Sequence, residues 1–81
     1  MSTKERVEAL AEKVLQSREP PEGLVTEIEA LAGKLEDSAR AIALRARTAA
    51  QAWKEGREGY ELDHRTATYA FLSALVQVLD E

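Results

Sequence analysis

The stretch from Pro21 to Glu55 decides the fold, and it reads PEGLVTEIEALAGKLEDSARAIALRARTAAQAWKE. Its apolar residues recur at steps of three and four, a spacing that winds onto one side of an α-helix. Pro21 suits the first turn of a helix, and either Gly56 or Gly59 suits the position just after its end. We therefore predict one long helix over about residues 21–55. Its apolar side consists of Leu24, Ile28, Leu31, Leu35, Ala39, Ile42, Ala46, Ala49 and Trp53.

Two features of this stretch favour a break instead. Gly33 costs about 1 kcal/mol relative to alanine in a helix interior. The segment 36–38, Glu-Asp-Ser, could open a second helix, because aspartate and serine are preferred at helix starts. The apolar spacing passes both features without a shift. We therefore expect a continuous rod of roughly 50 Å, at a rise of ~1.5 Å per residue.

Shorter helices are predicted on either side, over about residues 3–18 and 63–79. Ser2 and Glu5 have the spacing of a capping box, and Asp63 is a good N-cap. The last helix is apolar most of the way round, which is typical of a helix covered by more than one neighbour. The expected fold is all-α, one domain over residues 1–81 with three helices. The first helix should pack on the first half of the central one, and the last helix on its second half.

Length and charge narrow the class of protein. The chain has 81 residues and a net charge of −4. A negative chain has little general affinity for nucleic acid. The absence of cysteine rules out disulfides and is compatible with a reducing compartment. The chain starts without the apolar run of a signal peptide, and no apolar run approaches a membrane span. We therefore expect a cytoplasmic protein.

Residues with chemical potential are few. His64 is the only histidine, and it has neither a second histidine nor a cysteine with which to hold a metal ion. The sequence contains no glycine-rich phosphate loop and no recognisable nucleophile beside a base. We therefore expect no enzymatic activity, no cofactor and no metal. The function we predict is a small helical protein–protein interaction module, such as an adaptor, an assembly chaperone or a regulatory inhibitor.

The candidate partner-binding residues lie on and after the central helix. Basic side chains form a row along its outer side, and tryptophan and tyrosine are enriched at interfaces. An alternative function uses the same cationic row to bind RNA or a nucleoprotein. The candidates are Arg40, Leu44, Arg47, Trp53, Lys54, Arg57 and Tyr60.

Charge layout predicts a homodimer. Residues 21–38 carry five acidic side chains and one lysine, a net charge of −4, and residues 39–57 carry five basic side chains and one glutamate, a net charge of +4. Two central helices side by side would therefore favour an antiparallel arrangement, acidic half on basic half. Such a pair would also cover the last helix. The residues expected in the core or the dimer contact are Leu31, Leu35, Ile42, Phe71, Leu72, Leu75, Val78 and Leu79.

Overall fold

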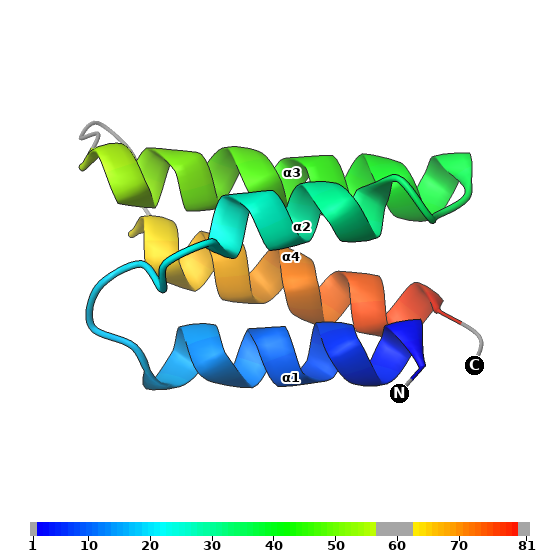
Figure 1. The fold of residues 1–81 in the computed structure, drawn as a ribbon, viewed down its shortest axis with the longest axis horizontal. Helices are drawn as coiled ribbons and strands as arrows, with labels where there is room; N and C mark the ends of the chain where they lie inside the picture. Colours follow the sequence, from blue (N-terminus) through cyan, green and yellow to red (C-terminus); the bar gives the residue numbers. More distant parts are fainter. Residues whose placement is uncertain (1, 57–62, 80–81) are drawn as a thin grey trace.

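The computed structural model of the chain describes residues 2–56 and 63–79, which form four α-helices and no strand (Figure 1). The helices are α1 (Thr3–Gln16), α2 (Leu24–Ala32), α3 (Asp37–Glu55) and α4 (His64–Val78). The all-α prediction is confirmed. The first and last helices, α1 and α4, begin and end within two residues of their predicted bounds.

The prediction of one continuous helix over residues 21–55 is wrong, and the described residues form four helices where three were expected. Helix α2 ends at Ala32, the chain turns back, and α3 begins at Asp37. Two tight backbone hydrogen bonds close the turn: the Lys34 amide donates to the carbonyl of Leu31 at 3.0 Å, and that of Leu35 donates to Ala32 at 3.1 Å. The longest dimension of the molecule is 34 Å, well short of the predicted rod.

The physical reason for the break is local. Gly33 is a poor helix former, and Glu36 takes an extended conformation (φ −72°, ψ 163°) immediately before α3. The alternative start near residues 36–38 is therefore the one the chain adopts. By turning back, the chain places the apolar side of α2 against α3. A nine-residue helix is only marginally stable alone and gains its stability from such packing.

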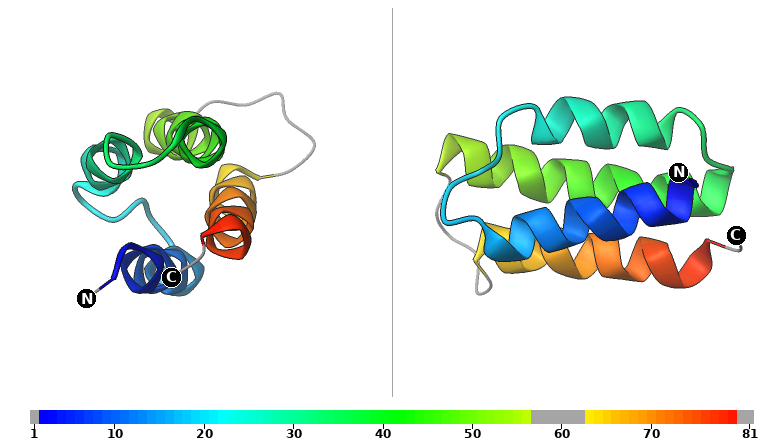
Figure 2. Two further views of the ribbon diagram at one scale, coloured as in Figure 1. Left: turned by 90° about the vertical axis from the view of Figure 1, so that its right-hand side faces the viewer. Right: turned by 60° about the horizontal axis from the view of Figure 1, so that its bottom comes forward.

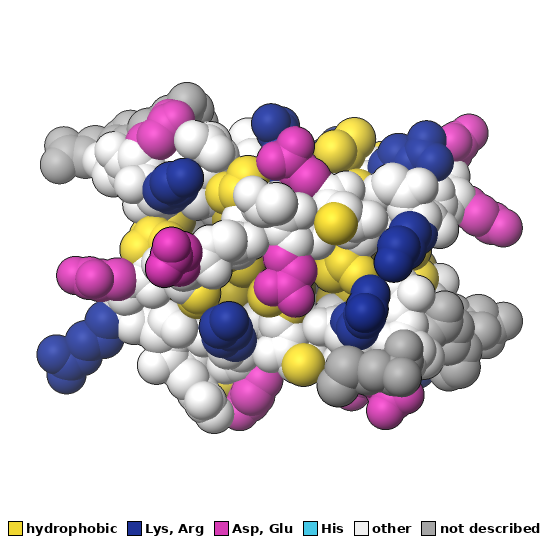
Figure 3. Space-filling model, viewed as in Figure 1, with side chains coloured by type: hydrophobic (Ala, Val, Ile, Leu, Met, Phe, Trp, Pro, Cys, Tyr) yellow, Lys and Arg dark blue, Asp and Glu magenta, His cyan; other side chains and the backbone are white. Residues whose placement is uncertain are grey.

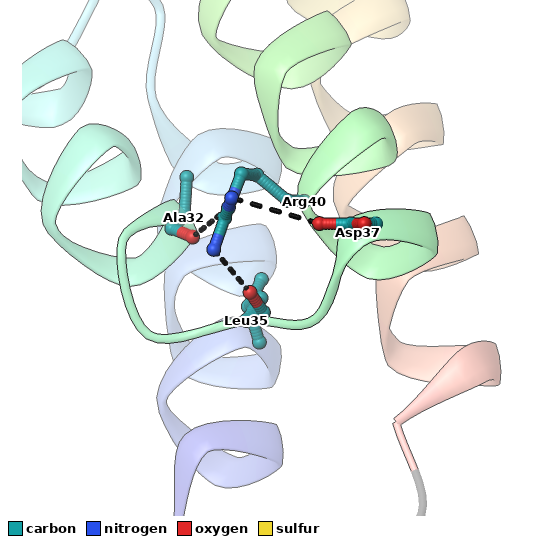
Figure 4. Close-up of polar contacts among 4 residues, drawn as sticks. All are labelled: Ala32, Leu35, Asp37 and Arg40. Carbon is teal, nitrogen blue, oxygen red and sulfur yellow. Dashed lines mark hydrogen bonds and ion pairs between the residues drawn. The ribbon is translucent and has the colours of Figure 1, made fainter.

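Arg40 ties the end of α2 to the start of α3 (Figure 4). Its Nε donates a hydrogen bond to the carbonyl of Ala32 at 3.2 Å, and its Nη2 donates to the carbonyl of Leu35 at 2.8 Å. Its Nη1 lies 3.7 Å from the carboxylate of Asp37. The last carbonyls of a helix lack partners within the helix and carry partial negative charge. The guanidinium therefore serves as a side-chain cap for α2.

Four helices pack around one core, each antiparallel to the next in the chain (Figure 2). Helix α4 packs against both α3 and α1, and α2 packs against α3. The predicted contact of the last helix with the second half of the central stretch is confirmed. The first helix was predicted to pack on the first half of the central stretch. In the structure, α1 packs mainly on α4 instead. Arg65 of α4 reinforces this contact, because its Nη1 donates to the carbonyl of Ser17, just after α1, at 3.1 Å.

Helix α3 contributes only alanine to the core. Larger side chains of the other three helices fill the volume, with Val7, Val14, Ile28, Leu72 and Leu75 among the most deeply buried. Of the predicted core residues, Leu31 and Leu35 are also buried, and Ile42, Phe71 and Leu79 pack against the core while partly exposed. The buried residues of α3 are Ala39, Ala43, Ala46, Ala49, Ala50 and Ala52.

Replacing Arg40 should destabilise the turn between α2 and α3. Arg40→Met keeps the aliphatic stem and removes both hydrogen bonds to carbonyls, so we expect a loss of about 1 kcal/mol in the free energy of unfolding. Arg45→Met on the exposed side of α3 is the matched control, with an expected change within about 0.5 kcal/mol. Urea unfolding of both variants measures the difference. Equal losses would show that the guanidinium does not hold the turn.

The two glycines that flank α2 should respond oppositely to alanine. Gly33 has a right-handed backbone, and a Cβ there would meet only the carbonyl oxygens of Ala30 and Glu29, at ordinary contact distances of 3.6 and 3.8 Å. Gly33→Ala should therefore stabilise by up to about 1 kcal/mol. Gly23 has φ +78°, so Gly23→Ala should destabilise by about 1 kcal/mol. Thermal unfolding checks both signs, and a destabilised Gly33→Ala would contradict the described turn.

Candidate interaction surface

Two of the predicted partner-binding arginines face α2. Besides the contacts of Arg40, the Nε of Arg47 lies 3.5 Å from the Oε2 of Glu29 on α2. This ion pair is about half exposed and contributes at most about 1 kcal/mol. Because the chain turns back after α2, its acidic segment already lies against its basic segment. The opposite charges from which we predicted a dimer therefore already face each other within one chain.

The other described candidates, Leu44, Trp53 and Lys54, also lie on α3. Leu44 is 45% exposed and lies between Arg40 and Arg47 on α3, and Trp53 packs partly against the core. Lys54 borders a shallow pocket of about 170 Å³ at the start of α2, together with Pro20, Pro21, Glu22, Gly23, Leu24, Val25, Thr26 and Ala50. Arg57 and Tyr60 lie outside the described residues.

The contacts of arginine side chains show which side of each helix meets which neighbour. On α4, Arg65 contacts the end of α1, so the side of α4 that carries Arg65 adjoins α1. At about 100° per residue, Phe71 and Val78 lie on the opposite flank of the buried Leu72, beside α3. On α3, Arg40 and Arg47 contact α2, which places Ile42 on the opposite flank, beside α4. Ile42, Phe71 and Val78 therefore border the same seam.

The side of α4 that points away from the core carries no charge. From Thr66 to Leu79 the sequence contains no acidic or basic residue, although 32% of the whole chain is charged. We call the exposed residues of this helix the α4 face: Thr66, Ala70, Ala74, Gln77 and Val78. On the other side of the molecule, over α2 and α1, acidic and basic side chains are interspersed, as Figure 3 shows.

The α4 face differs from the sequence prediction in two ways. Val78, predicted as a core or dimer-contact residue, is 51% exposed and is therefore not a core residue of the single chain. Ala70 and Ala74 were not selected, although both are exposed. The uncharged run from Thr66 to Leu79 was the available signal. The sequence alone does not show which side of this helix its neighbours leave open.

Asp63, the N-terminal cap of α4, is a carboxylate with a shifted pKa. The backbone amide of Thr66 donates to Asp63 at 2.8 Å and the hydroxyl of Thr66 at 3.0 Å. These hydrogen bonds favour the charged form and lower the pKa of Asp63 below its ordinary value of 3.8. The predicted N-cap is confirmed. Asp63 is fully exposed and belongs to the helix start rather than to a reactive site.

The described part of the chain contains no cluster of three or more metal-binding side chains. Within it, no helix is long and apolar enough to cross a membrane. No protein-family model, curated protein or solved structure matches the chain. The exposed and uncharged α4 face is therefore the feature on which a functional argument rests.

The Asp63 cap predicts a pH dependence. Because the pKa of Asp63 is lowered by folding, its contribution to stability is present above pH 3.8 and is lost as the pH falls through the lower, folded-state pKa. Asp63→Asn keeps an oxygen acceptor but cannot titrate. The stability difference between wild type and this variant, measured by urea unfolding, should shrink as the pH falls below about 4. A difference that does not change with pH would contradict the assignment.

Proposed function

We propose that this protein is a small non-enzymatic helical module that works by binding another protein chain through the α4 face. The observation that carries the proposal is a helix side that is open to water and yet has no charged residue between Thr66 and Leu79. The fully buried centres of protein interfaces are depleted in charged residues. Helix sides that only face water usually carry charged and polar residues.

The composition of the α4 face suits a neighbouring helix. Ala70 and Ala74 let another backbone come close, as the alanines of α3 already do for α2 and α4. Val78 is half exposed, so covering its remaining surface would contribute about 1 kcal/mol. Ile42 and Phe71 lie beside the face and are partly exposed. A bound helix would therefore gain apolar contacts on the α3 side as well.

A role as an adaptor, assembly chaperone or regulatory inhibitor in the cytoplasm belongs to the same proposal. The alternative, binding of RNA or a nucleoprotein, depends on the cationic row of α3. Arg40 and Arg47 direct donors of that row toward α2, which leaves fewer for a phosphate. The α4 face contains no cation at all. We therefore rest the proposal on protein binding.

Site-specific photo-crosslinking in cells of the native host tests the proposal. A photoreactive amino acid replaces Ala74 on the α4 face in one variant and Ala9 on the exposed side of α1 in the other. We expect a discrete crosslinked protein adduct from position 74, abolished when Val78→Lys is added, and none of the same size from position 9. Equal adducts from both positions, or none from position 74, would contradict the proposal.

A further inference from the structure

We propose that the chain bound at the α4 face is a second copy of this protein, so that two α4 helices pack against each other across a two-fold axis. This inference rests on the proposed function and names its partner. In such a dimer the same surface patch is used twice and must be complementary to itself. The relevant properties are the charge of the α4 face, the area of the contact between the two copies, and the net charge of the chain.

An uncharged face is electrostatically compatible with itself. A charged patch would meet like charges in a symmetric pair, which costs free energy. The α4 face brings no charge into the contact, and its hydrogen-bonding side chains, Thr66 and Gln77, can both donate and accept. Arg45, exposed on α3, can keep its guanidinium in water while its aliphatic stem lies along apolar surface. Two copies can thus form this contact without burying an unpaired charge.

The available area fits a weak dimer. Helix α4 has 15 residues and is therefore about 22 Å long. With the adjoining flank of α3, at a spacing of about 10 Å between helix axes, the contact would bury on the order of 1,000 Å² in total. That value lies just below the range of specific, stable interfaces, which begins at about 1,200 Å². Contacts of this size are typical of weak or transient complexes, so we expect a micromolar rather than a nanomolar dissociation constant.

The charges at the contact, and therefore the response to salt, distinguish this dimer from the antiparallel dimer predicted from the sequence. That dimer joined acidic and basic halves of two chains, whereas Glu29 and Arg47 already join those halves within one chain. A dimer held by opposite charges weakens as salt rises. A dimer through the α4 face joins two chains of net charge −4 by uncharged surface, so salt should leave it unchanged or strengthen it.

The test is the molecular mass in solution of the full chain. Light scattering and sedimentation equilibrium follow wild type, Ala74→Glu and Ala9→Glu from about 5 to about 500 μM protein. Each series is repeated at about 0.02 M and about 0.5 M salt. The masses of wild type and Ala9→Glu should rise with protein concentration from that of one chain, 9.0 kDa, toward twice that mass. Ala74→Glu should need at least about tenfold higher protein concentration to reach the same mass, which corresponds to a dissociation constant at least about tenfold higher.

The other outcomes each reject a defined statement. A wild type that stays monomeric rejects the second copy. A dimer equally weakened by both variants, or one that dissociates as salt rises, rejects the α4 face as its contact. A monomer that still forms the crosslink at position 74 leaves the proposed function standing, and a monomer without the crosslink rejects both. If circular dichroism shows that Ala74→Glu is unfolded, Val78→Ser replaces it, with a weaker dimer as the expected result.

Discussion

The buried side of α3 consists only of alanine, and this constraint governs where the other helices lie. Helix α3 packs against both α2 and α4. A methyl side chain takes little room between two helix axes, so both neighbours can approach closely. Ala43, Ala46 and Ala50 are fully buried, and a larger side chain at any of them would push a neighbour away. The large side chains that are buried consequently come from α1, α2 and α4 and, in the turn between α2 and α3, from Leu35.

The sequence predicted the helices whose ends are marked by local signals. The capping box of Ser2 and Glu5, the N-cap Asp63 and the left-handed Gly56 are all present as expected. These signals involve residues within one turn of each other, so they can be recognised without knowledge of the fold. The same reasoning offered Gly33 and the segment 36–38 as a break, but the apolar spacing outweighed them.

The continuous helix was predicted wrongly because apolar spacing reports burial, not helicity. Leu35 fits the helical spacing and is buried, yet it lies in the turn. A turn residue can fill the same core position that a helical residue would fill. What decides between the two is long-range: the packing of α2 on α3, and the hydrogen bonds from Arg40 to the carbonyls of Ala32 and Leu35. Neither can be identified before the reversal is known.

The same reversal explains why the candidate site was only partly predicted. It turns Arg40 and Arg47 toward α2. These arginines, which were predicted to form an outer cationic row, therefore make contacts within the chain. On the last helix, the apolar character of most of the surface was recognised from the sequence. Which side stays open depends on α1 as well as α3, and the contact between Arg65 and Ser17 that fixes α1 spans distant parts of the chain. Val78 was therefore grouped with the core, although it is exposed.

The exposed side of α4 differs in composition from that of α1. Helix α1 occupies a comparable place, with one side in the core, and its exposed side carries charges such as Glu8, Glu12 and Lys13. Charged residues on such a side cost the fold little and keep the surface hydrated. Helix α4 has two neighbours and an open side, yet on that side it repeats the alanines that α3 buries. The proposed partner of the α4 face would be a third neighbour, and it would cover these alanines as α2 and α4 cover those of α3.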